Sequence, residues 1–396
     1  MKEKFKSLLS NYKTMVVLYL VFAIAASVLS LNVGSKFTSD DGKEYKRYNN
    51  YVIFQTSFDH LIDSKDLYIH HPEDHYDLYK YSPTFSVFFG VFHYMPDWLG
   101  LNLWNILNAL IFLMAVYYLP HFNSYQKGLI LLVSVVELMT SLQNNQSNGL
   151  MVGLMIFAFA FLEKDKPIWA TLMMVMSVYV KLFSLVGFAL FLFYPKKWKS
   201  ALYSLFWALV LFVIPLLFVG IEQYIFLFKS YLNMLTADHD ASYGFSMMGW
   251  LHTWFHLDIN KLIPLIIGTL LLLIPYLKTS SYKSTAFRYL SLTSILIWVI
   301  IFNHKAESPT FIIAMAGMAI WYFMGEKNKL NTTLFILAFV FSSLAPTDIF
   351  PVYIRHHIFE PYVVKAVPCI LIWMKITWEL LSFTKKKEEG YLLAED

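Results

Sequence analysis

The chain has 396 residues, of which 58% are hydrophobic and only 15% are charged, whereas a soluble domain usually carries about 25% charged residues. The net charge of +4 carries no nucleic-acid signal, so no nucleic-acid partner is expected. Long apolar runs recur from end to end and predict one all-α polytopic membrane domain over 1–396, because a β-barrel would show ten-residue alternation instead.

The N-terminal segment combines a basic start with a long apolar run. MKEKFKSLLSNYK leads into the run at 13–33, an order that is similar to that of a signal peptide. Because the run is long enough to span a bilayer, we expect an uncleaved signal anchor. The single cysteine, Cys369, excludes an internal disulfide and a cysteine metal site.

Short clusters of Lys and Arg separate the apolar runs and predict the cytoplasmic loops, which carry an excess of positive charge. The clusters are the N-terminus, EKDK at 163–166, PKKWK at 195–199, KTSSYKSTAFR at 278–288, EKNK at 326–329 and KKK at 385–387. With all of them inside, we expect a multi-pass protein of a bacterial-type cell membrane, with about twelve transmembrane or re-entrant helices and both termini cytoplasmic. The polar loops 34–82 and 221–259 then lie outside, with ten of the twelve histidines.

The first polar loop, 34–82, contains a segment of helical period. An apolar stripe at spacings of 3, 4 and 3 predicts an amphipathic helix over 48–63 that lies on the membrane with its apolar face down. The stripe is Tyr51, Phe54, Phe58 and Leu61. At the head of this helix, Asn49 or Asn50 is either an ordinary N-cap or part of the polar floor of an active site.

Other polar residues of this loop are candidates for catalysis or binding. Asp40, Asp41 and Glu44 follow the first span, and each is either a solvated loop charge or a catalytic base. The motif YKYSP at 79–83 returns the chain to the membrane, because its proline suits the first turn of a helix and its tyrosines suit the membrane interface. Tyr81 is also a candidate contact for a sugar.

Two later segments do not fit simple crossings. Residues 83–119, broken by MPDW at 95–98, fit one crossing plus a re-entrant piece. Residues 167–194 must cross and return within 28 residues, so each leg provides about 20 Å of helix for a hydrocarbon core of about 30 Å. The turn around Lys181 is therefore expected below the outer surface, against protein or a wet cavity.

The segment SLQNNQSNGL at 141–150 lies at the outer end between two spans. Four amides in six residues are a heavy polar load at membrane depth, where buried amides must find partners. The segment is either a capped helix–helix turn or a hydrogen-bonding wall for a sugar, in which Asn145, Gln146 and Asn148 would take part.

Cationic residues at the outer face are candidates for binding a phosphate. Lys181 lies in an apolar stretch, where an ionisable residue suggests function by default, although its ammonium group could also snorkel to the surface. His304, in the turn FNHKAESPTF at 302–311, could donate to a phosphate. Arg355 and His356, in the last outer loop, suit the same anion or lipid phosphates in general.

A metal site is not expected. His252 and His256 share a helix face at i, i+4, but spacing fixes no third ligand, and Trp250 and Trp254 beside them favour an interfacial anchor. The DHD segment at 238–240 is an equally weak metal motif. We therefore expect neither a metal ion nor another cofactor.

Taken together, these segments resemble the GT-C-type integral membrane glycosyltransferases, and most closely glycosyltransferase family 87. The resemblance covers most of the chain, chiefly 40–200. Its motifs are KDLY at 65–68, YKYSPTF at 79–85, NNQSNGL at 144–150, VKLF at 180–183, LFYPKKWK at 192–199, and the late turn with His304 and SPTF.

The resemblance implies a GT-C-like helical bundle that transfers a hexose, such as mannose, with inversion. The donor would be a polyprenyl-phosphate sugar, and the acceptor would be an extracytoplasmic lipid or glycan. The family has its catalytic aspartate near the start of the loop helix, at the position of Asn50. Because an amide cannot take a proton, either Asp40, Asp41 or Glu44 is the base, or Asn50 only orients the acceptor, or the protein does not transfer sugar.

We expect the remaining site residues to meet in one wet pocket that opens to the exterior. Lys181 stands where the family has a lysine, and His304 heads the comparable late turn. The donor phosphate would contact Lys181, His304, Arg355 and His356, and the sugar or acceptor would contact Asn49, Asn145, Gln146, Asn148 and Tyr81.

Two other functions remain open. A secondary transporter or lipid flippase would use Lys181 and its short hairpin as a midplane site, but the sequence has no inverted-repeat hydropathy, and its polar residues gather on one face. A catalytically inactive GT-C-like membrane protein would explain the amide at position 50.

Overall fold

The computed structural model describes residues 2–32, 36–39, 42–237, 242–384 and 388–391 of the chain. Within these ranges the protein is helical, apart from one short antiparallel hairpin, β1 (Lys36–Thr38) with β2 (Glu44–Lys46). The helices of the first half are α1 (Lys2–Ser10), α2 (Tyr12–Asn32), α3 (Asn49–Ile62), α4 (Pro83–His93), α5 (Asp97–Tyr118), α6 (Ser124–Gln143), α7 (Asn148–Glu163), α8 (Pro167–Val180) and the 3-10 helix η1 (Leu182–Phe193).

The second half continues the same architecture. Its helices are α9 (Lys197–Val213), η2 (Ile214–Leu217), α10 (Ile221–Ala237), α11 (Met247–Phe255), α12 (Leu262–Leu273), η4 (Ile274–Leu277), η5 (Thr279–Ser281), α13 (Thr285–Ile301), η6 (Ser308–Phe311), α14 (Ile312–Met324), α15 (Lys329–Ala338), α16 (Val352–Ile354) and α17 (Val367–Leu381), with π-helical turns η7 (Phe339–Leu344) and η8 (Arg355–Phe359).

Apolar helices of membrane-spanning length are consistent with the expected polytopic membrane protein. Among the described residues, four helical segments are long and apolar enough to cross a bilayer: Tyr12–Asn32, Asp97–Tyr118, Ser124–Gln143 and Lys197–Leu217. Several shorter apolar helices, of 10–17 residues, accompany them. The number of crossings, expected to be about twelve, stays a prediction.

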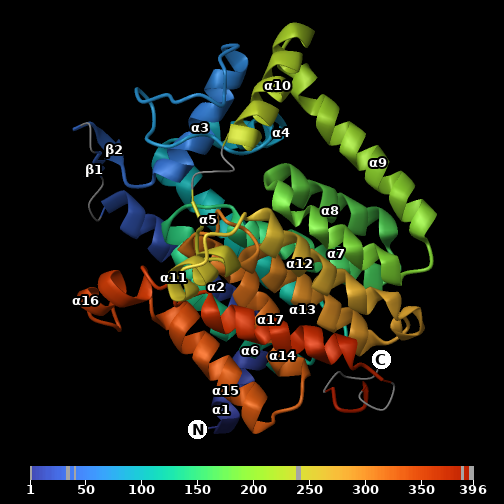
Figure 1. Ribbon diagram of the computed structural model, residues 1–396. Coiled ribbons are helices and arrows are strands. Elements are labelled where there is room, and N and C mark those ends of the chain that lie inside the picture. The colour runs from blue at the N-terminus through green and yellow to red at the C-terminus, as the bar shows by residue number, and fades with distance from the viewer. Residues whose placement is uncertain (1, 33–35, 40–41, 238–241, 385–387, 392–396) are drawn as a thin grey trace.

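The helices pack around a core in which α13 and α14 are buried along nearly their whole length. The two helices pack against each other in the bundle of Figure 1, α14 also contacts α6, and α5 contacts both α2 and α7. By contrast, α9 leaves many apolar side chains exposed, among them Leu202, Leu205 and Phe206. A helix that is apolar all round suits a lipid environment on its free side.

The structure has a helix, α3, within the predicted range 48–63, and its amphipathic placement on the membrane stays a prediction. All four residues of its apolar stripe are buried, but they pack against protein, where we expected them to face lipid. Phe54, for example, makes edge contacts with Phe85 of α4 and with Trp104 of α5, and Gly90 of α4 packs tightly on the ring of Phe58. Helix α3 packs against α4, so it is part of the helical bundle.

The two unusual segments have helix lengths that agree with the expectation, while their paths across the membrane stay predictions. The run 83–119 consists of an 11-residue helix, α4, followed by one helix of spanning length, α5. Pro83 begins α4 as predicted, and Ser82 caps this helix by accepting a hydrogen bond from the Phe85 amide at 3.2 Å. The run 167–194 forms two legs of 14 and 12 residues, α8 and η1, which meet at Lys181.

Candidate active site

One polar cavity of about 580 Å³ collects six of the thirteen predicted site residues, and its volume is typical of a ligand pocket. It lies between the N-terminal end of α3, the end of the first polar loop, the α8–η1 break, α10 and the 303–310 turn. Its polar and aromatic lining includes Asn49, Asn50, Tyr76, Asp77, Lys80, Tyr81, Gln146, Lys181, Tyr231, Asn303, His304, Lys305 and Glu307.

The asparagine pair does not cap α3. The N-cap is Tyr48, which makes no capping hydrogen bond with its side chain. Instead, Asn49 Oδ1 accepts a hydrogen bond from the backbone N–H of Tyr76 at 3.0 Å, and Asn50 Nδ2 donates to the Asn144 carbonyl at 2.9 Å. The capping interpretation is therefore wrong, because both amides connect α3 to distant segments that surround the cavity.

The start of α3 is also held to the long apolar helix α5. Lys46 Nζ lies 2.6 Å from Asp97 Oδ2, and the Tyr48 hydroxyl donates to the same oxygen at 2.8 Å. Asp97 belongs to the first turn of α5, where a carboxylate also interacts favourably with the helix dipole. The two contacts hold the head of α3 at one position relative to the bundle.

Lys181 lies at the break between α8 and η1, with an extended backbone at φ −143° and ψ 122°. Its Nζ donates to Asn148 Oδ1 at 2.8 Å, and its ammonium group lies 5.5 Å from the centre of the Tyr81 ring. The side chain lines the cavity, so the sequence-based expectation that it meets a polar pocket below the surface agrees with its position.

The amide-rich segment forms the tight turn between α6 and α7, with Asn145 in the left-handed region at φ 53°. Asn148 Nδ2 donates to Gln146 Oε1 at 2.8 Å, and Gln146 Nε2 donates to Glu307 Oε2 at 2.9 Å. A continuous chain of hydrogen bonds thus joins Lys181 to Glu307. Of the three amides of this segment that were proposed for sugar binding, only Gln146 lines the cavity.

Asn145 and Asn148 have structural roles in this turn. Both side chains are fully buried. Asn145 Nδ2 donates to the Leu142 carbonyl at 2.9 Å. The backbone carbonyl of Asn145 accepts a hydrogen bond from the Trp104 indole N–H at 2.9 Å. Asn148 orients Lys181, so it acts on the site through that lysine.

Tyr81 presents a phenol group to the same cavity. Burial raises the pKa of this phenol well above its usual value, although a hydrogen bond from Ser147 Oγ, at 3.3 Å, opposes the shift. The group therefore stays protonated at neutral pH. It is suited to hydrogen bonding with a sugar hydroxyl and unsuited to acting as a base.

The turn that carries His304 accepts hydrogen bonds from another loop, residues 242–245. Ser242 Oγ donates to the His304 carbonyl at 3.1 Å, and the Phe245 N–H donates to the Ala306 carbonyl at 2.8 Å. Gly244 lies between them at φ 54°, and a Cβ atom there would be 2.6 Å from the His304 carbonyl oxygen. Only glycine permits this close approach.

The carboxylates in the cavity are not those that the sequence suggested. Glu44 belongs to β2 and is exposed, and the cavity lining does not include it. Asp40 and Asp41 lie outside the residues that the structure describes. The lining contains Asp77 and Glu307 instead. No sequence motif or spacing marks either residue as part of a site. Each reaches the cavity because the fold brings it into contact with segments far away in the chain.

Residues 79–302 match the sequence profile of glycosyltransferase family 87. The matched segment is more than half of the chain and includes Tyr81, Gln146 and Lys181. The chain belongs to glycosyltransferase family 87. No curated protein matches it. The family match begins after α3 and ends just before His304, so the region of the expected family aspartate lies outside it.

Two predicted phosphate ligands of this glycosyltransferase lie away from the cavity. Arg355 Nη2 donates to Asp348 Oδ1 at 2.8 Å, and His356 Nδ1 lies 2.8 Å from Glu360 Oε2. Neither side chain lines the cavity. Each of these side chains instead pairs with a nearby carboxylate, that of Asp348 for Arg355 and that of Glu360 for His356.

The histidine pair considered as a metal motif does not share a helix face. His252 lies on α11 with Nδ1 2.6 Å from the Asp258 carboxylate, and its ring stacks on Tyr243. His256 ends the helix in the left-handed conformation at φ 53°. The pair at i, i+4 is therefore separated by the end of the helix, and the segment 238–240 lies outside the residues described.

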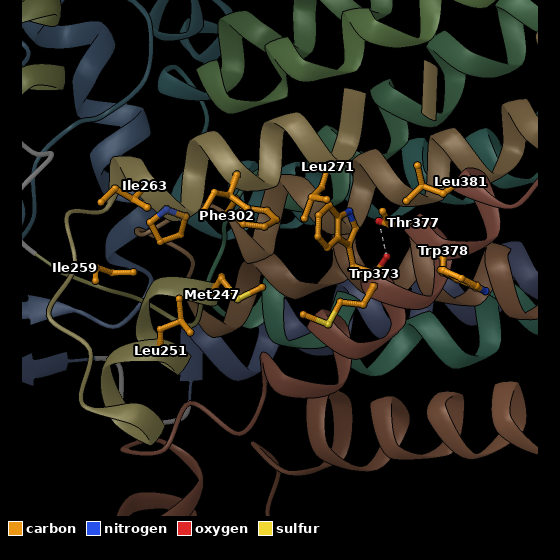
Figure 2. A pocket seen from close by; sticks show the side chains of 13 residues that line it. Met247, Leu251, Ile259, Ile263, Leu271, Phe302, Trp373, Thr377, Trp378 and Leu381 are labelled. Carbon is orange, nitrogen blue, oxygen red and sulfur yellow. Dashed lines mark hydrogen bonds between the residues drawn. The ribbon is translucent and has the colours of Figure 1, made fainter. Parts of the chain in front are cut away.

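A second cavity of the glycosyltransferase, of about 310 Å³, is almost wholly apolar. Figure 2 shows it between α11, α12 and α17, with Phe302 and Trp373 at its centre. Phe302 lines this apolar cavity, while the next two residues, Asn303 and His304, line the polar one. Consecutive residues of one short stretch of backbone therefore line two different cavities.

Proposed function

We propose that this glycosyltransferase moves a hexose from a polyprenyl-phosphate donor to an extracytoplasmic lipid or glycan acceptor, with inversion at the anomeric carbon. The observation that carries the proposal is the composition of the polar cavity, where cations, amides and carboxylates line one space. A single displacement needs a base for the acceptor hydroxyl and cations for the departing phosphate.

The cationic residues that line the cavity favour a phosphate as the leaving group. Lys181 and His304 both line the cavity, and the hydrogen bond to Asn148 fixes the lysine ammonium group in advance. Negative charge grows on the phosphate as its bond to the anomeric carbon breaks. A fixed cation in a partly desolvated site stabilises this charge without further reorganisation.

Asp77 is the carboxylate that we assign as the base. Its neighbour Tyr76 is bonded to Asn49, so Asp77 is held at the N-terminal end of α3, where the family resemblance implies an aspartate and this chain has Asn50. The side chain is 52% exposed and lines the cavity, so it can reach an acceptor hydroxyl. Asp77 would take the hydroxyl proton while the acceptor oxygen bonds to the anomeric carbon and the phosphate leaves with the electron pair.

The apolar cavity supports a lipid-linked donor. Its lining is nearly free of polar atoms, and one of its lining residues, Phe302, directly precedes Asn303 and His304 of the polar cavity. A prenyl chain in the apolar cavity would bring its phosphate toward His304. The polar cavity also has an apolar side, formed by Met234 and Leu235 of α10. These two residues would contact the prenyl chain of the donor as well.

The test is a transfer assay with purified protein in liposomes that contain a polyprenyl-phosphate hexose. We expect Asp77→Asn and Lys181→Ala each to lower kcat by about 10²-fold or more, because one removes the base and the other removes a cation that acts in the transition state. Release of polyprenyl phosphate, followed by chromatography, is the readout.

Two matched variants serve as controls. Glu44→Gln removes a carboxylate of the same loop that does not line the cavity, and Lys329→Ala removes an exposed lysine of α15. Both should keep the activity of the wild type within about twofold, as is usual for surface substitutions. Full activity of Asp77→Asn and Lys181→Ala would show that the proposed roles are wrong.

A further inference from the structure

Three histidines and an aspartate gather outside the polar cavity, at the C-terminal end of α3. His60, from α3, lies with its Nε2 2.9 Å from Asp74 Oδ2, and its ring centre is 3.8 Å from that of His71. His60, His71 and Asp74 each offer one ligand atom, and these atoms lie within 4.8 Å of one another. The ring of His75 is 6.0 Å from that of His71, centre to centre.

Burial separates this cluster from an ordinary solvated loop. His60, His71 and His75 are 2%, 6% and 2% exposed, whereas the neighbouring His70 is exposed to solvent. His75 Nδ1 is buried and has no hydrogen-bond partner among the described residues. A buried, unpaired ring nitrogen costs free energy, and a bound cation would satisfy it.

The hydrogen bonds of His71 also favour a cation. Its Nε2 lies 2.7 Å from the Asp66 carbonyl oxygen, which can only accept, so this nitrogen carries a proton. In the neutral ring, Nδ1 then has a lone pair, 3.3 Å from the carboxylate oxygen Oε1 of Glu73. A protonated ring donates its Nδ1–H to that carboxylate, whereas a neutral ring leaves the Nδ1 lone pair available to a metal ion. A ring nitrogen that donates to a backbone carbonyl while its partner nitrogen is free to ligate is the usual arrangement of a metal-binding histidine.

We infer that His60, His71 and Asp74 bind one divalent cation of the zinc type, with His75 available for the fourth position. Imidazole and carboxylate ligands suit Zn²⁺, whose ligands lie about 2.0–2.2 Å from the ion. The Asp74 side chain is 36% exposed, so an ion can enter from solution. The 2.9 Å contact between His60 and Asp74 would open as both atoms turn to the ion.

The ion would join α3 to the segment that forms one side of the polar cavity. Asp74 and His75 are followed directly by Tyr76 and Asp77, which line that cavity. The bound ion would therefore have a structural role, because it would hold this segment against α3. Its site is distinct from the proposed phosphate-binding residues around Lys181. It differs from our sequence-based expectation of no metal, which rested on His252, His256 and the 238–240 segment.

The test measures metal binding by the full-length protein, purified with a tag that contains no histidine. The protein is stripped with a chelator and dialysed against micromolar Zn²⁺, and the bound zinc is counted by mass spectrometry. Co²⁺ replaces Zn²⁺ in a parallel titration, because its visible absorption reports tetrahedral coordination. We expect one Zn²⁺ per chain and a rise in Tm when Zn²⁺ is added.

Matched variants decide whether the cluster is the site. Asp74→Asn and His71→Ala should weaken Zn²⁺ binding at least tenfold and abolish the Tm rise, while His70→Ala should behave as the wild type. Asp74→Asn keeps an acceptor for His60, so it preserves the local fold if His71→Ala does not. Absence of zinc from the wild type, unchanged binding by Asp74→Asn, or an equal loss in His70→Ala would each overturn the inference.

Discussion

At the scale of single residues, the site depends on buried amides that hold charged groups in place. Asn148 is the clearest case, because its Oδ1 accepts from Lys181 while its Nδ2 donates to Gln146 and to the Pro309 carbonyl. One buried side chain thus connects the cation of the site with the turn that carries His304 and Glu307.

We expect Asn148→Ala to destabilise the protein and to weaken donor binding. The substitution leaves buried polar groups without partners, which costs about 1–3 kcal/mol, and it frees the Lys181 ammonium group to move. A lower Tm in detergent and a higher KM for the lipid donor are the measurements. Asn144→Ala, on the same turn, is the control, because its exposed amide donates only to the Thr140 carbonyl of its own helix.

Of the four phosphate ligands proposed from the sequence, Lys181 and His304 line the cavity, whereas the proposed carboxylate Glu44 does not and Asp77 lines it instead. Lys181 is conspicuous because it is a charge within an apolar run. Asp77 is one of several carboxylates in a polar loop and has no distinguishing neighbours in sequence. It reaches the cavity because the Tyr76 N–H bonds to Asn49, 27 residues earlier in the chain, and no local period encodes that contact.

At the scale of elements, a buried ion pair fixes the late turn against the bundle. Lys365, just before α17, lies 2.9 Å from Glu137 Oε1 of α6, and both side chains are almost wholly buried. Lys365 Nζ also donates to Ser308 Oγ at 2.9 Å, at the first residue of η6. The pair therefore ties α6 and α17 to the segment that follows His304.

Removing one partner of this pair should be costly. Lys365→Met leaves the Glu137 carboxylate buried without compensation, and we expect the free energy of unfolding to fall by about 3–5 kcal/mol. The double variant with Glu137→Leu removes both charges and should recover most of that loss. Lys375→Met on α17 breaks a more accessible Lys375–Glu379 pair and should cost less than about 1 kcal/mol. Equal Tm values for both single lysine variants would contradict this account.

The helices themselves were largely predictable from the sequence. The apolar stripe of α3, the Ser82–Pro83 start of α4 and the short legs around Lys181 follow from hydrophobic period and from the chemistry of single residues. The orientation of α3 was not predictable in the same way. Its stripe suits lipid or protein equally, and only the aromatic neighbours from α4 and α5 show that protein covers it.

At the scale of the whole molecule, membership of glycosyltransferase family 87 and the apolar helices agree with a membrane-integral transferase. The orientation in the membrane is open to a direct test, because the only cysteine, Cys369, is buried. If loop 34–82 is extracytoplasmic, His70→Cys should react with a membrane-impermeant maleimide in intact cells. Lys329→Cys, in the EKNK cluster, should react only after permeabilisation. The reverse labelling pattern would show that the topology is opposite to the one predicted from the sequence.

The sequence by itself determined the class of protein, the positions of most helices and the break at Lys181, because hydrophobicity, period and proline chemistry act locally along the chain. The tertiary structure alone decided which polar residues meet: Asp77 and Glu307 in the cavity, Arg355 and His356 away from it, and three histidines beside Asp74. Such groupings depend on side-chain contacts between segments that are distant in sequence, and neither composition nor spacing encodes those contacts.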